Sequence, residues 1–282
     1  MKELILRKSP AQIGRTMLRH AVGKLMNLPM RAHAYYKSLH NPQYDFSGSR
    51  QPAHTLQALN RYVAEYGIMY RENITDHDQK GEMEETSQYY LYKYIEAQAP
   101  RANVTVCDIG AFYCGADVHF LKKFPQATVY GLDFGDMLGL NRDIAMDRLK
   151  LFPGYPLETL EKLVSEGKRR IFDYVIFART AALMNHNELF SYMENIRLLA
   201  NNVCFLEVAK TTSMLTPTLN VRTIPLDKPV KIFNLVRIHN YPALLEKYGF
   251  EVVDAAVLPP TTFKQYFVPD HQFIFTAGRN KN

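Results

Sequence analysis

The sequence predicts an α/β protein with a doubly wound, mostly parallel seven-stranded sheet, an antiparallel last strand and an N-terminal helical region. Three observations lead to this fold class. After Pro100, strand-like runs alternate with stretches of helical spacing. These runs are almost continuously apolar, as strands buried on both faces of a parallel sheet are. The last two runs are joined by a loop without a helix, which favours antiparallel pairing.

Before Pro100 the spacing of apolar residues predicts helices and no strand. The three expected helices cover residues 13–26, 53–70 and 84–97, and a loop rich in Pro, Gly, Asn and Ser covers residues 40–52. We therefore expect two parts: an N-terminal helical region, residues 1–100, and an α/β domain, residues 101–282.

Within the second part, each expected strand ends near a glycine, an acid or a polar residue. The strand candidates are residues 104–109, 128–132, 149–152, 172–177, 203–208, 251–258 and 272–276. The helix candidates are residues 115–124, 136–148, 156–167, 187–200 and 241–248. Residues 211–239 form an insertion that is long for a connection and whose alternation suits a hairpin. In a doubly wound sheet, ligands bind at the carboxyl ends of the strands.

Composition limits the function classes. With 47% apolar and 22% charged residues the chain has ordinary globular composition. No apolar run approaches the ~20 residues that span a bilayer, and three unpaired-looking cysteines favour a reducing compartment, so a cytoplasmic protein is expected. Of the net charge of +6, all is carried by the first forty residues. A nucleic-acid surface over the whole body is therefore not expected.

The basic arm contains an amphipathic helix over residues 6–26. Arginine and lysine residues stand between its apolar positions. Three interpretations remain open for it: the helix makes peripheral contact with an anionic membrane, it serves as an organelle-targeting segment, or it packs its apolar stripe on the domain.

The stretch from Val104 to Gly135 holds the residues most typical of a binding site. The first strand ends in Asp108 and Gly110, Gly115 opens the next helix, and Asp133 ends the second strand. A glycine at such a turn permits close approach, and helix N-termini attract negative groups. The pyrophosphate fingerprint is not met, because Phe112 replaces its second glycine. The pattern favours a nucleoside ligand without a diphosphate and disfavours NAD or FAD.

The motifs "VCDIGAFYCGAD" and "VYGLDFG" resemble the cofactor-binding half of class I S-adenosylmethionine-dependent methyltransferases. Some sugar and small-molecule methyltransferases carry a first motif of the form acid-x-Gly-x-x-x-Gly-Gly. Asp108 and Gly110 match it, Gly115 matches its last position, and Cys114 replaces the preceding glycine. "FDYVIFA" and "YPALLEKYGFEVVDAAVL" look like the fourth strand and the late helix-turn-strand. The resemblance covers about residues 101–280 and implies a Rossmann-like domain with S-adenosylmethionine as cofactor.

The resemblance also implies positions for the cofactor. Asp108, Gly110 and Ala111 are expected to line its methionine and ribose parts, next to the helix that Gly115 opens. Asp133 is expected to hold the ribose hydroxyls. The other expected contacts are Phe134, Gly154 and Tyr155 around the adenine and Arg179 at the end of the fourth strand.

The implied reaction is methyl transfer to an oxygen or nitrogen of a small-molecule or glycan acceptor. An oxygen nucleophile needs a base, and His186 and His239 are the candidates; a hydrogen-bonded structural role is the alternative for each. Metal-dependent relatives carry an Asp pair where Arg179 and Thr180 stand, so no catalytic metal is expected. In this fold, the insertion at residues 211–239 and the N-terminal helices would roof the acceptor pocket.

Two other functions remain open at this stage. A methyltransferase-fold protein without activity can serve as a binding or scaffold module, and the altered glycine motif gives this reading weight. A nucleotide-sugar or NAD enzyme is disfavoured, because the pyrophosphate loop is missing.

Overall fold

The computed structural model describes residues 87–111, 114–133, 147–211, 221–233, 236–258 and 271–281. They belong to one unit of the chain, Phe46–Asn282. The first two expected N-terminal helices, the basic helix at residues 6–26 and nearly all of the helix expected at residues 136–148 lie outside the described residues. The expected boundary at Pro100 and the role of the basic arm stay predictions.

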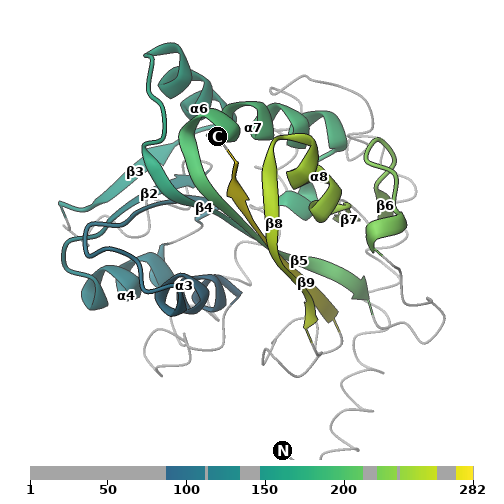
Figure 1. The fold of residues 1–282 in the computed structure, drawn as a ribbon, viewed down its shortest axis with the longest axis horizontal. Helices are drawn as coiled ribbons and strands as arrows, with labels where there is room; N and C mark the ends of the chain where they lie inside the picture. The colour runs from purple at the N-terminus through teal and green to yellow at the C-terminus, as the bar shows by residue number, and fades with distance from the viewer. Residues whose placement is uncertain are drawn as a thin grey trace, which may run out of the picture. The chain divides into compact units, whose positions relative to one another are not determined.

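Seven strands form one sheet in the order β3-β2-β1-β4-β5-β9-β8 (Figure 1). The strands are β1 Thr105–Ile109, β2 Thr128–Asp133, β3 Leu149–Pro153, β4 Phe172–Ala178, β5 Ala200–Thr211, β8 Phe250–Leu258 and β9 His271–Asn280. Strands β1 to β5 pair in parallel, and β9 runs antiparallel to both β5 and β8. The predicted fold class is thereby confirmed.

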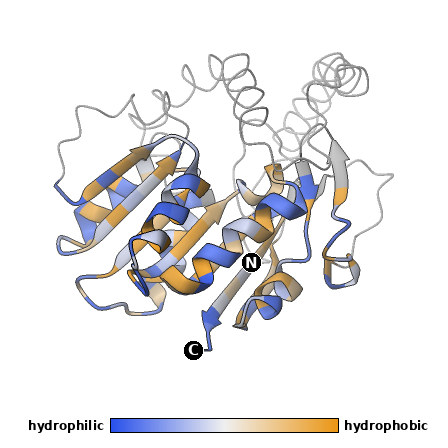
Figure 2. Ribbon diagram, turned by 90° about the horizontal axis from the view of Figure 1, so that it is seen from above, coloured by the Kyte–Doolittle hydropathy of each residue, from blue (hydrophilic) through white to orange (hydrophobic). Residues whose placement is uncertain are grey.

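Helices cover both faces of this sheet (Figure 1). The helices are α3 Ser87–Ala97, α4 Gly115–Lys123, α6 Pro156–Ser165, α7 His186–Leu199 and α8 Tyr241–Lys247. One apolar cluster joins α6, α7 and α8 to the sheet, and a second joins α3 and α4 to its other face. The apolar residues concentrate on the central strands, whereas the helices turn hydrophilic residues outward (Figure 2). Burial on both faces explains why the strand sequences are almost continuously apolar.

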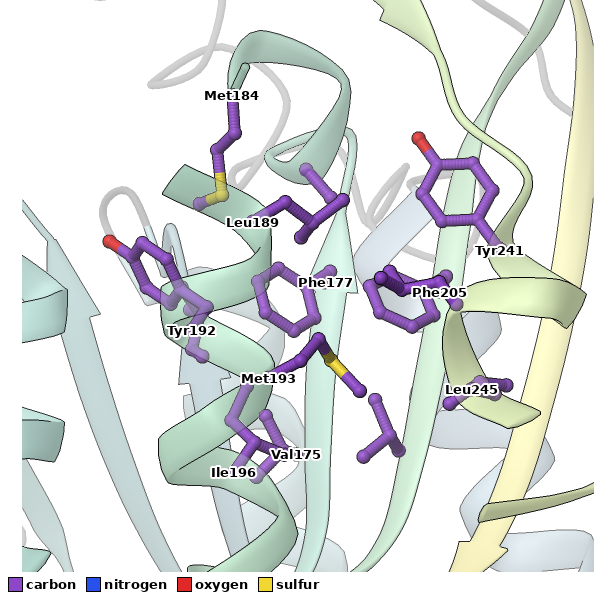
Figure 3. Packing of buried hydrophobic residues seen from close by; sticks show 14 of the residues in the cluster. Val175, Phe177, Met184, Leu189, Tyr192, Met193, Ile196, Phe205, Tyr241 and Leu245 are labelled. Carbon is purple, nitrogen blue, oxygen red and sulfur yellow. The ribbon is translucent and has the colours of Figure 1, made fainter. Parts of the chain in front are cut away.

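Aromatic side chains fill the core between β4, β5, α7 and α8 (Figure 3). Phe177 and Phe205 stack with ring centroids 4.9 Å apart, and Tyr192 of α7 meets Phe177 edge-on. Tyr241 of α8 packs on Phe205 from the other side, with centroids 5.0 Å apart. This core anchors β4 just below its carboxyl end, where the loop with Arg179 begins.

Asparagine caps set the starts of α7 and α8. The Asn185 side chain accepts a hydrogen bond from the Glu188 amide at 2.9 Å, and the Asn240 side chain accepts one from the Ala243 amide at 3.1 Å. Asn240 also donates to the carbonyl of Ile224 at 3.0 Å, which ties the insertion to α8.

The insertion contains the predicted hairpin. It consists of the 3-10 helix η6 (Val221–Thr223) and strands β6 (Val230–Phe233) and β7 (Val236–Ile238), which pair antiparallel.

No helix within the described ranges has both the length and the apolar character needed to cross a membrane.

Candidate functional site

Backbone hydrogen bonds join the carboxyl ends of the parallel strands into one continuous edge. The Gly110 amide after β1 donates to the Leu132 carbonyl of β2 at 2.8 Å. The Gly154 amide after β3 donates to the Asp133 carbonyl at 3.0 Å. The Arg179 amide after β4 donates to the carbonyl of Leu206 in β5 at 2.9 Å. The sequence-predicted strand ends are therefore neighbours in space, as a parallel sheet requires.

Gly110 is a glycine for two physical reasons. Its φ of +81° lies in the left-handed region, which side chains disfavour. A Cβ there would also stand 2.1 Å from the Oγ1 atom of Thr180. The space that the missing side chain leaves is thus filled by Thr180, which locks the β1 loop against the β4 loop. The sequence motif was interpreted as room for a ligand; in the structure this room accommodates a neighbouring loop.

The turn between β1 and α4 brings the helix N-terminus close to β2. Ala111 is fully buried, and its amide donates to the Leu132 carbonyl at 3.3 Å. Cys114 follows in a left-handed conformation, with φ of 60°, and Gly115 begins α4. Gly131 of β2 lets this turn approach, because a Cβ on it would lie 3.1 Å from the Cys114 Sγ atom. Cys114 is therefore a packing residue of the turn.

Two buried aspartates meet behind this turn. Asp108 of β1 and Asp117 of α4 have no exposed surface, and their carboxyl groups approach closely enough to share a hydrogen bond. Helix α3 supplies one partner to each. The Gln88 side chain donates to Oδ2 of Asp108 at 3.4 Å, and the Tyr92 hydroxyl donates to Oδ1 of Asp117. Apart from a hydrogen bond between the two carboxyl groups, the second oxygens, Oδ1 of Asp108 and Oδ2 of Asp117, have no hydrogen-bond partner among the described residues.

Burial sets the charge of this pair. It raises the pKa of Asp108 well above its ordinary value, and the nearby charges of Asp117 and Asp133 raise it further. Burial also raises the pKa of Asp117, to about 6, although hydrogen bonds from Tyr92 and Cys114 favour its ionised form. Two carboxylates that are both fully buried cannot both ionise readily, so burial and mutual repulsion favour a single proton on the pair.

Three of the remaining expected cofactor residues lie at the carboxyl ends of β2 and β3. Asp133, at the end of β2, is 7% exposed. Gly154 turns the chain after β3 with φ of +128° and has open space where a Cβ would be. Tyr155 is buried, and its hydroxyl donates to Glu188 of α7 at 2.5 Å, so this end of its side chain is already used. Phe134 lies outside the described residues.

The ends of β4 and β5 form the other half of the edge. Arg179 is exposed and has a left-handed backbone, with φ of 62°. After it comes the 3-10 helix η5, Ala181–Leu183. Its first amides, those of Ala181 and Ala182, donate to the two carboxyl oxygens of Glu207 at 2.8 and 3.1 Å. Burial raises the pKa of Glu207 to about 8, while these amides and Arg179 oppose the rise.

The two candidate histidines lie beyond η5. His186 begins α7, is partly exposed, and packs edge-on against Phe190 with centroids 5.8 Å apart. His239 is 4% exposed, and its Nε2 atom lies 3.1 Å from the Met184 carbonyl, which can only accept. Burial lowers the pKa of His239 to about 4. His239 is thus neutral near pH 7 and a weak base; a catalytic role for either histidine stays a prediction.

The sequence interpretation missed Asp117, Glu207 and the two α3 residues that contact the pair. A signal was present for the first two. Asp117 shares a helix face with Phe120 and Leu121, which are fully buried, and Glu207 alternates with the fully buried Phe205 along β5. An acid on an apolar face is unusual enough to mark a site. Gln88 and Tyr92 carried no signal, since their role depends on where α3 packs.

Comparison with known structures identifies the fold. The chain superimposes on a 1,6-didemethyltoxoflavin N1-methyltransferase from Burkholderia thailandensis, whose structure holds 1,6-didemethyltoxoflavin and S-adenosylhomocysteine. The TM-score is 0.51 and the identity 15%, over 77% of this chain and 90% of that one. The chain has a class I methyltransferase fold. In this fold the edge built from Asp108, Asp133 and Arg179 is the carboxyl edge of the parallel strands.

Two further methyltransferase structures match at lower similarity. A SAM-dependent methyltransferase from Archaeoglobus fulgidus has a TM-score of 0.45 and 13% identity, over 68% of this chain and 94% of that one. Mitomycin 7-O-methyltransferase MmcR has a TM-score of 0.42 and 17% identity, over 63% of this chain and 49% of its own. No family model matches the sequence, and no curated protein does. Within the described ranges, no group of three or more His, Cys, Asp or Glu side chains is arranged to hold a metal ion.

Proposed function

We propose that the chain binds S-adenosylmethionine at the carboxyl edge of β1 and β2 and transfers a methyl group to an oxygen or nitrogen of a small-molecule or glycan acceptor. One observation carries the proposal: Oδ1 of the fully buried Asp108 has no partner. It lies at the end of the first strand of a methyltransferase fold, with Asp133 at the end of the next strand.

The residues present fit this cofactor. An unpaired buried carboxyl oxygen costs free energy in the absence of a donor, and the α-ammonium group of the methionine part is such a donor. Asp133 presents a second carboxylate, suited to the two hydroxyls of a ribose. Gly154 leaves open space beside it. Within the described ranges, no arginine or lysine forms an ion pair with Asp108, which suits a ligand that brings its own positive charge.

The chemical demands on the protein are modest. When bound, S-adenosylmethionine supplies an electrophilic methyl group on a sulfonium. The chain's own task is to hold the acceptor in line with that group and to keep water away. The exposed Arg179 and the partly exposed His186 stand on the β4 side of the edge, where an acceptor would meet the donor. His186 is the better placed of the two histidines to take the acceptor's proton, since His239 is buried and a weak base.

The test is transfer of a labelled methyl group. The purified full-length chain is incubated with methyl-labelled S-adenosylmethionine and a small-molecule extract as acceptor pool, and the labelled products are separated. We expect label in a small-molecule or glycan fraction, and none with Asp133→Ala as the matched control. Binding of S-adenosylhomocysteine without any transfer would favour the inactive binding module instead. Absence of binding would overturn the proposal.

Localisation and acceptor remain parts of the same proposal. A cytoplasmic enzyme acting on a dissolved acceptor is consistent with the three free, buried cysteines at positions 107, 114 and 204. Peripheral membrane contact through residues 6–26 is the alternative, and it is tested by comparing vesicle binding of the full chain and of a chain lacking residues 1–30. Equal binding by the two chains would contradict membrane contact through residues 6–26.

A further inference from the structure

We infer that Asp108 and Asp117 act as a proton-sharing pair that releases its single proton when the cofactor's α-ammonium group binds. The inference rests on the proposed function and adds to it a second acidic residue, Asp117, and a proton that accompanies binding. It requires three conditions: the carboxyl groups must touch, they must lack a cation, and one oxygen must be available to the ligand.

Contact between the carboxyl groups follows from their positions. Asp108 points from β1 toward the face that α3 and α4 cover, and Asp117 lies in the first turn of α4. Both are fully buried, and each carboxyl group influences the pKa of the other at hydrogen-bonding range. A hydrogen bond between two carboxyl groups requires one proton, because two carboxylates only accept.

No positive charge among the described residues neutralises the pair. The titratable groups of those residues that surround it are a phenol, two thiols and a third carboxyl. They are Tyr92 of α3, Cys114 before α4, Asp133 of β2 and, on the opposite face of β1, Cys107. None of them is a cation, so the shared proton is what keeps the free protein from burying two like charges.

The available oxygens point to a cationic ligand. On α3, the Gln88 side chain occupies Oδ2 of Asp108 and the Tyr92 hydroxyl occupies Oδ1 of Asp117. Apart from the proton that the two carboxyl groups share, Oδ1 of Asp108 and Oδ2 of Asp117 are buried without a hydrogen-bond partner among the described residues. An ammonium group that donates to Asp108 replaces the proton as the source of positive charge. The proton then leaves to solvent, and no covalent bond to carbon is made or broken.

Calorimetry measures this proton directly. S-adenosylhomocysteine is titrated into the full-length protein at about pH 7, in phosphate and in Tris, whose protonation enthalpies differ. We expect the observed enthalpy to depend on the buffer with a slope of about one proton released per ligand, and the affinity to rise up to about tenfold per pH unit. Binding with no buffer dependence overturns the inference and leaves the proposed function standing. Absence of binding overturns both.

Two variants test whether the proton released on binding comes from the aspartate pair. Asp117→Asn keeps the shape and can donate a hydrogen bond to an ionised Asp108, so we expect binding to persist with the proton release reduced to near zero. Asp254→Asn, on the exposed edge strand β8, should keep the wild-type release. Full release in Asp117→Asn would contradict the assignment. Should that variant fail to fold, infrared difference spectra of the wild type decide: ligand binding should remove a protonated-carboxyl band, and an unchanged band would contradict the inference.

Discussion

Two buried carboxyl sites stand at the same edge of this sheet and differ in how they are satisfied. Within β5, directly after the residue that pairs with the end of β4, both oxygens of Glu207 accept backbone amides of η5. At the end of β1, Asp108 and Asp117 each keep one oxygen without a partner. All three side chains are fully buried, and burial raises the pKa of each. Burial and a raised pKa therefore do not distinguish a structural acid from a ligand-binding one.

The two sites differ in how many carboxyl oxygens accept a hydrogen bond from the protein. Both oxygens of Glu207 do, so its role is to fix the loop that carries Arg179 and Thr180. The aspartate pair is incomplete, and this is the state expected of a site that a ligand completes. Replacing the acid by its isosteric amide should therefore lower ligand affinity at Asp108 and lower stability at Glu207.

The largest expected effect is that of Asp108→Asn on ligand affinity. The substitution puts an amide NH2 against the cofactor's ammonium group and removes a charged acceptor, so the dissociation constant for S-adenosylhomocysteine should rise about 100-fold. Its thermal stability should stay equal or rise, since the new NH2 can donate to Asp117. Titration calorimetry and thermal melts measure the two quantities, and a wild-type affinity would show that Asp108 is as structural as Glu207.

Glu207→Gln should show the reverse pattern. A glutamine NH2 would face one of the two amides of η5, and that amide would lose its acceptor. We expect the free energy of unfolding to fall by about 1–3 kcal/mol, with direct ligand affinity much less affected. Denaturant titrations at about pH 9, above the pKa of about 8, test this with Glu207 ionised. Glu251→Gln, exposed on β8, is the matched control. Unchanged stability would mean that the amides find another partner.

Asp117→Asn should stabilise the protein in a pH-dependent way. The folded-state pKa of about 6 exceeds the ordinary value of 3.8, so the folded protein holds this proton more tightly than the unfolded chain. The wild type accordingly loses stability as pH rises from about 4 to 6. Above this window we expect the variant to be more stable by about 1–3 kcal/mol, and below it the difference should vanish. A constant difference across both ranges would contradict the shift.

The smallest effect should come from His239→Gln. Glutamine can still donate to the Met184 carbonyl, and the main loss is packing against Tyr241, whose ring centroid lies 5.8 Å from that of the histidine. We expect a loss of about 1 kcal/mol in stability and an unchanged shape of the pH–rate profile. If kcat falls and one limb of the pH–rate profile disappears, His239 is the base and His186 is the structural residue.

Much of the fold could be predicted from the sequence because its signals are local. All seven main strands were expected within a few residues of their observed positions, and the hairpin of the insertion was expected too. The largest difference at the start of a strand is that of β5, which begins at Ala200 instead of residue 203. Its first residues, Ala-Asn-Asn, lack a strand pattern, yet the Asn202 side chain donates to the Asp173 carbonyl of β4 at 2.9 Å. Neighbouring strands, not local propensity, define that start.

The site was predictable only in part for the same reason. Asp108, Gly110, Asp133 and Gly154 follow from strand ends, which sequence patterns locate. The pairing of Asp108 with Asp117 depends on how α4 packs against β1, and no local pattern encodes it. Likewise, Gly110 was correctly placed in the turn, but its contact with Thr180 joins segments seventy residues apart.

The most direct test of the central claim is the affinity of S-adenosylhomocysteine for the wild type and for Asp133→Ala, with Asp254→Ala as the control. The account predicts one ligand per chain in the wild type and the control. It predicts a loss of at least about 100-fold in Asp133→Ala, because the ribose hydroxyls lose their charged acceptor. Equal affinity in all three proteins would contradict a cofactor held between the ends of β1 and β2.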